Sequence, residues 1–226
     1  TLLSGSSSAV FASEADATGI TVINGGSGAD TINVSSVDFD NAVTIKGGVA
    51  IDAIALGTQT ADVVLSSGLT IDTLSGFTTG TDDIHFDLSD METAGANVIS
   101  VTHDFIGGLG TSVAAGDTPV ILAVPSATVL TAANVLNYTA ATAANGAAVE
   151  VLLEATGGLL TTGATGVTAA DAMFIMYDNS SVITIAHLSF QATYAANTQI
   201  AKVEVLDLVT LTGVTADLVA ADFAFI

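Results

Sequence analysis

Residues 25–33 read Gly-Gly-Ser-Gly-Ala-Asp-Thr-Ile-Asn, and this nonapeptide fits the pattern G-G-x-G-x-D-x-U-x at every specified position, where U is apolar. Its glycines, Gly25, Gly26 and Gly28, permit a tight turn, and Asp30 adds a carboxylate. Ile32 then begins a short strand that is buried. Turns of this kind suit Ca²⁺, which takes roughly 6–8 oxygen ligands. Because one turn supplies only about half of that shell, we expect a second turn to stack against it.

A second copy of the pattern follows at residues 47–55. It keeps Gly47, Gly48 and Asp52, but Ala50 replaces the third glycine. The copy begins 22 residues after Gly25 (47 minus 25), whereas two nonapeptides would occupy only about 18. We therefore expect an irregular segment between the two turns. Two interpretations of the second turn stay open, a shared calcium site or a glycine-rich turn with a solvated aspartate.

The composition is lopsided in charge. The 226 residues carry 23 acidic side chains against two lysines, Lys46 and Lys202, no arginine, and a net charge of −21. We expect such a chain not to bind nucleic acid, because the phosphate backbone is bound mainly through Lys and Arg. Divalent cations are its natural counter-charge, and a bound cation stabilises the folded state by mass action. No apolar run approaches the roughly 20 residues that span a bilayer, and cysteine is absent.

Residues 1–75 have the spacing of short strands, with β-branched runs separated by Gly or Asp. We predict successive strands of a repeat-type β-roll at residues 20–23, 31–34, 42–45, 54–56 and 62–65. The predicted fold is mainly β: a short parallel β-roll or β-helix section with calcium-binding turns, followed over residues 76–226 by a larger β domain, a sandwich or roll.

In residues 76–226 the predicted elements are longer. The stretch 81–89 alternates, placing Ile84, Phe86 and Leu88 on one face and Asp83, His85 and Asp87 on the other. Further strands are predicted at 119–124, in a hairpin over 173–185, at 200–212 and at the acidic-apolar C-terminus. Short helices are predicted at 132–141 and, capped by Asn145, at 147–155. Asp82, Asp83 and Asp87 either form a second cation site or belong to a solvated strand face.

Three segments together resemble a known family: the nonapeptide at 25–33, the stretch 77–89 and the end of the chain at 211–226. They resemble the C-terminal region of RTX-type proteins, which are calcium-binding bacterial proteins exported by type I secretion, surface-layer proteins among them. The resemblance implies a β-roll that folds on meeting external Ca²⁺ and an uncleaved C-terminal export signal. It also implies an extracellular location at the bacterial cell surface.

Catalytic motifs are missing from the sequence. The three histidines, His85, His103 and His187, lack the HExxH or other zinc spacing, and there is neither a G-x-S-x-G elbow nor a cysteine nucleophile. The segment 107–110 lacks the context of a dinucleotide-binding loop. We therefore expect no enzyme active site and assign the histidines no chemistry.

These observations favour a calcium-dependent extracellular structural protein that self-assembles into a surface layer or fibre. The alternatives are a non-catalytic export and folding module of a secreted hydrolase or toxin, and a calcium-dependent adhesin that binds cell-surface glycans. The expected cofactor is Ca²⁺. The candidate ligands are Gly25, Gly26, Gly28, Asp30, Asp38, Asp40, Gly47, Gly48, Asp52, Asp82 and Asp83.

Overall fold

The structure is a computed structural model of the chain. It describes residues 19–87 apart from 38, 40, 49, 59 and 66–70, and then 135–155, 160–163, 166–169, 171–179, 182–214 and 218–226. Short strand segments at 2–3, 8–10, 104–108, 111–112, 121–123 and 128–130 are also described.

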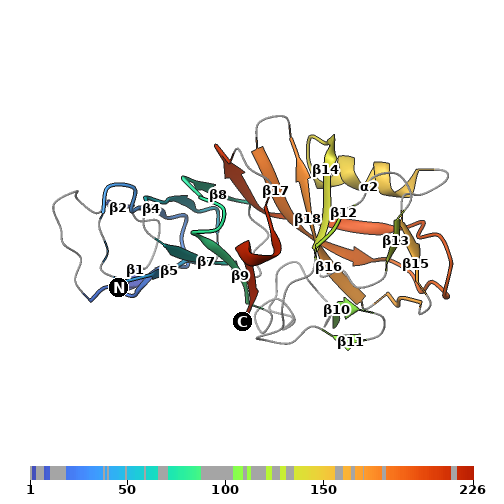
Figure 1. Cartoon of the computed structure of the whole chain (residues 1–226). Helices are drawn as coiled ribbons and strands as arrows, with labels where there is room; N and C mark the ends of the chain where they lie inside the picture. The colour runs from blue at the N-terminus through green and yellow to red at the C-terminus, as the bar shows by residue number, and fades with distance from the viewer. Residues whose placement is uncertain are drawn as a thin grey trace.

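The N-terminal part of the chain winds in successive turns, like a solenoid, and places its strands alternately in two sheets (Figure 1). We call this part the coil. One sheet has the order β1-β3-β5-β7-β9 and ends on β19 (Phe223–Phe225), and β2, β4, β6 and β8 follow one another in the other sheet. All neighbouring strands in this part are parallel. The bounds are β1 Leu2–Leu3, β2 Ser8–Val10, β3 Val22–Gly26, β4 Thr31–Asn33, β5 Val43–Gly48, β6 Ala53–Ala55, β7 Ala61–Leu65, β8 Asp72–Ser75 and β9 Asp83–Phe86.

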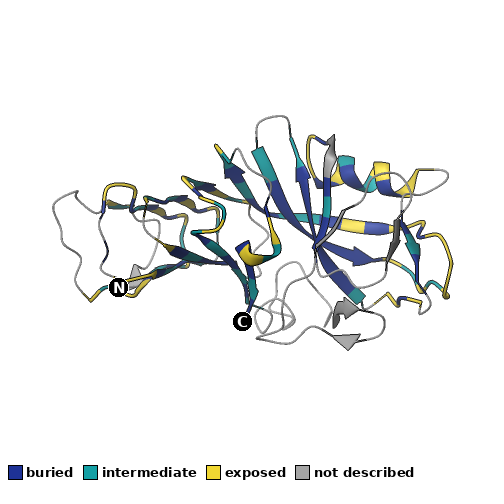
Figure 2. Cartoon of the chain, viewed as in Figure 1, coloured by how far each residue is buried: buried dark blue, intermediate teal, exposed yellow. Residues whose placement is uncertain are grey.

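The core of the coil consists of apolar side chains that repeat from one turn to the next. In the second sheet Ile32, Ile54 and Leu74 are directly aligned in register and are buried. The first sheet contributes the buried row Ile23, Ile45, Val63 and Ile84. Side chains alternate between the two faces of a strand. The residues before and after each of these positions in its strand therefore point away from the core, as the banding in Figure 2 shows.

The second sheet continues without a break into the C-terminal part. Strand β18 (Val203–Thr212) pairs in parallel with β8, and β17 (Val182–Phe190) and β16 (Asp171–Asp178) follow as antiparallel neighbours. Beyond β16 lie β10 (Asp104–Gly108), β11 (Thr111–Ser112), β14 (Val135–Thr142) and β12 (Ile121–Ala123). The strands β13 (Thr128–Leu130) and β15 (Leu160–Thr162) form a separate pair.

The C-terminus returns to the coil. After the 3-10 turn η1 (Ala220–Asp222), β19 (Phe223–Phe225) pairs in parallel with β9 and becomes an edge of the first sheet. Figure 1 shows the end of the chain, marked C, beside β9, although the two strands are far apart in the sequence. The Phe86 ring stacks on Phe174 of β16 with centroids 3.7 Å apart, and Phe225 lies 5.7 Å from Phe86. Aromatic packing thus joins the coil, β16 and the end of the chain.

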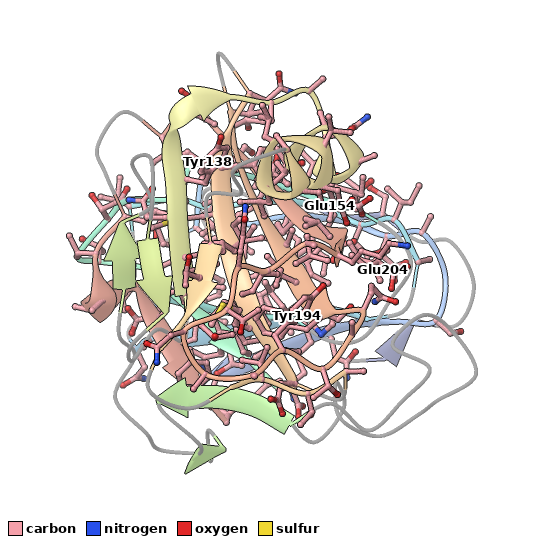
Figure 3. The ribbon with its side chains drawn as sticks, turned by 90° about the vertical axis from the view of Figure 1, so that its right-hand side faces the viewer. Tyr138, Glu154, Tyr194 and Glu204 are labelled. Atoms are coloured by element: carbon pink, nitrogen blue, oxygen red, sulfur yellow. The ribbon has the colours of Figure 1, made fainter. Side chains whose placement is uncertain are left out.

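Helix α2 (Gly146–Glu154) covers the part of β18 that extends past β8. The Asn145 side chain caps it by accepting a hydrogen bond from Ala148 N. Glu150 Oε1 accepts from Val205 N at 2.8 Å, and Glu154 Oε1 accepts from Val203 N at 2.9 Å. Glu154 is labelled in Figure 3. The two carboxylates satisfy backbone amides that would otherwise form an open strand edge.

Most of the predicted elements are confirmed. The five short strands at 20–65 correspond to β3–β7, the alternating stretch contains β9, the hairpin is β16 and β17, and the helix at 147–155 is α2. The fold is mainly β with parallel sheets. No helix among the described residues is long and apolar enough to cross a membrane.

The helix predicted at 132–141 is wrong, because residues 135–142 form strand β14. Ala-rich composition favoured a helix there. Strand β14 instead lies between β12 and β16 and pairs in parallel with both. Its Val135 and Leu136 side chains are buried, so pairing on both edges and burial outweigh the local helix propensity.

Candidate cation-binding sites

The two glycine-rich turns stack on each other, and their second glycines share one backbone conformation. Gly26 pairs in register with Gly48, and their φ angles are 107° and 109°, a region that favours glycine. A Cβ added to Gly25 would lie 2.6 Å from Asp30 Oδ2, and one added to Gly47 would overlap Asp52 Oδ2. The glycines therefore allow each aspartate to fold back against its own turn.

A ladder of aspartates runs along this edge of the coil. Asp30 N donates to Asp52 Oδ1 at 2.8 Å, and Asp52 N donates to Asp72 Oδ1 at 2.9 Å. Asp30 and Asp52 are buried. We call these three residues the aspartate ladder. Successive aspartates of the ladder are one turn of the coil apart, with 22 residues from Asp30 to Asp52 and 20 from Asp52 to Asp72.

Asp72 was not predicted as a site residue, because residues 66–70 lack the paired glycines. A weaker signal was present in the sequence. The pattern Asp-x-Ile or Asp-x-Leu recurs in Asp30-Thr31-Ile32, Asp52-Ala53-Ile54 and Asp72-Thr73-Leu74. This shorter pattern is present in all three stacked turns, whereas the full nonapeptide pattern is present only in the turn that has all its glycines.

The ladder places carboxyl groups where ionisation is unfavourable. Burial raises the pKa of Asp52, and the charge of Asp30 raises it further, while the hydrogen bond from Asp30 N acts against both. Burial also raises the pKa of Asp72, to about 7, with a contribution from the charge of Asp52. Asp52 Oδ2 is buried and has no hydrogen-bond partner among the described residues. An ion or a proton is therefore the natural partner of this carboxylate.

Ala50 occupies the place of the third glycine and has a φ of 134°. Side chains rarely adopt this conformation, which costs on the order of 1–3 kcal/mol. The second turn therefore holds a residue other than glycine in a conformation that favours glycine.

Asp82 lies on the opposite edge of the coil and is fully buried. Its Oδ1 accepts from Ala61 N and its Oδ2 from Thr78 N. Asp222 repeats this arrangement one strand further on, accepting from Gly80 N and Val219 N. In both residues the two carboxylate oxygens bind backbone amides and tie successive turns together.

Asp83 belongs to a different group, on the outer face of the first sheet. It is directly opposite Asp62 in register, and His85 Nε2 lies 3.9 Å from Asp62 Oδ1. One ligand atom from each of Asp62, Asp83 and His85 lies within 4.8 Å of the others, so this triad can hold a metal ion. Burial and the charge of Asp62 raise the pKa of Asp83, and His85 lowers it. Asp62 and His85 were not predicted as site residues, because only strand pairing brings them together.

The structure thus separates the predicted ligands into three places. Asp30 and Asp52 come together with their glycines. Asp82 and Asp83 are adjacent in sequence, but Asp82 binds backbone amides at the opposite edge of the coil, whereas Asp83 lies on the outer face of the first sheet. Asp38 and Asp40 lie outside the described residues.

Comparison of the chain with protein-family models, with curated proteins and with solved structures found no match.

Proposed function

We propose that the protein is a calcium-dependent, non-catalytic structural protein that self-assembles at the bacterial cell surface. The observation that carries this proposal is the buried Asp52 Oδ2 in a turn whose glycines leave room for the carboxylate. A buried carboxylate oxygen without a donor is costly, and Ca²⁺ prefers oxygen ligands. The two stacked turns would supply Asp30 and Asp52 to one ion, which would link two turns of the coil.

Charge supports the same proposal. A chain with a net charge of −21 and two lysines repels itself in the compact state, and bound cations reduce that repulsion. A ligand that binds only the folded state stabilises it by about 2.7 kcal/mol at a concentration of 100 times its dissociation constant. Calcium outside the cell would therefore promote folding where the protein acts.

Assembly has a structural route in the edge strands of the first sheet, as the described residues define it. Strands β1 and β19 are the two edges of the first sheet, and unpaired strand edges are ready templates for pairing with another chain. Contact between unlike edges of successive copies would extend as a fibre or layer.

The proposal is tested by titrating the metal-free chain with CaCl₂ while circular dichroism and light scattering are recorded. We expect calcium to raise the thermal midpoint and to produce assemblies that dissolve in EGTA. Asp52→Asn keeps an oxygen for the Asp30 amide but removes the charge, so it should weaken the calcium response. Glu204→Gln, an exposed position on β18, is the matched control. An identical calcium response in Asp52→Asn and wild type would contradict calcium binding at the ladder, and calcium-independent particle size would contradict calcium-driven assembly.

A further inference from the structure

We propose that Asp62, Asp83 and His85 form a second metal site, one that selects a transition-metal ion such as Zn²⁺ over Ca²⁺ and clips β7 to β9. This site is independent of the calcium proposal. The aspartate ladder lies at a turn, whereas the triad lies on the outer face of the first sheet.

The separations between the ligand atoms of the triad suit a bound zinc ion. Two donors bound to one tetrahedral zinc ion at about 2.0–2.1 Å lie roughly 3.4 Å apart. The 3.9 Å between His85 Nε2 and Asp62 Oδ1 is close to that separation and too long for a hydrogen bond. Small side-chain rotations bring the three ligand atoms onto one ion, since all lie within 4.8 Å.

Negative charges gather at the triad. Like charges that face each other across paired strands destabilise a sheet, and Asp62 and Asp83 form such a pair. Asp222 adds a third negative charge near Asp83. Lys46, on β5, is in register with Val64 and makes no ion pair with Asp62 or Asp83 within the described residues. A divalent cation would remove this repulsion.

The donor atoms of the triad favour a transition metal over calcium. Imidazole nitrogen favours Zn²⁺, Cu²⁺ and Ni²⁺, whereas Ca²⁺ binds through six to eight oxygens. Side-chain exposures of 18% for His85 and 25% for Asp62 leave access for the ion and for water as a further ligand. Three protein ligands plus water is a coordination that zinc commonly adopts.

The test is calorimetric titration of the full chain with ZnCl₂ in saturating CaCl₂. We expect one zinc ion per chain, undisplaced by excess calcium. His85→Ala and Asp62→Asn should each weaken binding at least about tenfold, because even the loss of outer-shell partners costs about 10–100-fold in metal affinity. His103→Ala controls for binding through another histidine.

Two results would overturn the proposal: no zinc uptake by the wild-type chain, or unchanged zinc affinity in His85→Ala. The circular dichroism spectrum of each variant in calcium shows whether it is folded. A Co²⁺-loaded sample gives a second readout, since d–d absorption of the wild type should be lost in His85→Ala. Failure of calcium to bind at the ladder would leave these zinc results interpretable, because the two sites share no residue.

Discussion

At the scale of single residues, the aspartates of the coil have two distinct roles. Asp82 and Asp222 use both oxygens to bind backbone amides of adjacent turns. Asp52 uses only one oxygen in this way and buries the other without a hydrogen-bond partner among the described residues. The same residue type is therefore a structural fastener on one edge and a candidate ligand on the other.

The ladder predicts how stability depends on pH in the absence of metal. The pKa of Asp72 is about 7 in the folded chain against an ordinary 3.8, so the folded state binds a proton that the unfolded state has lost. Stability should consequently fall as the pH rises from about 4 to about 7. Asp72→Asn removes the titration and keeps an acceptor for Asp52 N, so its unfolding free energy should fall less.

The measurement is urea unfolding in EDTA at pH 5 and pH 8. We expect Asp72→Asn to reduce the pH-dependent loss of unfolding free energy by on the order of 1–2 kcal/mol, since solvent partly screens this carboxyl group. Glu204→Gln makes the same change of charge on β18 and should leave the loss as in wild type. Equal pH dependence in Asp72→Asn and wild type would disprove the assignment.

At the scale of elements, helix α2 acts as a cover for a strand edge. Glu150 and Glu154 are four residues apart, and their carboxylates meet the amides of Val205 and Val203, two residues apart on β18. One helical turn rises about 5.4 Å, and two strand residues span about 6.6 Å. Because these two spacings are similar, carboxylates on one face of the helix can accept hydrogen bonds from successive free amides along the strand edge.

Replacement of both glutamates by alanine should leave two amides without acceptors. We expect a loss of about 1–3 kcal/mol for each amide, together with aggregation through the uncovered edge. The Gln pair, Glu150→Gln with Glu154→Gln, retains the acceptors and should be milder. Denaturant unfolding and light scattering measure the two effects. Val151→Ala, at a position 69% exposed, is the control, and equal behaviour of the Ala and Gln pairs would refute the edge-cover role.

At the scale of the whole molecule, the coil and the C-terminal part are joined twice. The second sheet runs through β8 into β18, and the first sheet ends on β19. Phe225 is buried and packs near both Phe86 of β9 and Phe174 of β16. We therefore expect the described parts to unfold as one cooperative unit.

Phe225→Ala tests this coupling. Large-to-small changes in a core cost about 3–5 kcal/mol for Phe, and the loss should appear in both parts together. Hydrogen exchange followed by mass spectrometry should show faster exchange in β7 and β9 and equally in β16 and β17. Ile226→Ala, at a position 38% exposed, should change exchange far less. Faster exchange confined to one part would contradict a single unit.

Local rules in the sequence determined the repeating coil. The glycines set the turns, the alternation of apolar residues set the strand faces, and Asn145 set the start of α2, because each depends on neighbours in the chain. Tertiary structure alone decided that residues 135–142 form a central strand, that Asp62 faces Asp83 and His85, and that β19 closes the first sheet. These outcomes depend on the register between strands that are about 20 or more residues apart in the sequence. The length of each turn of the coil and the burial of its core residues together set that register.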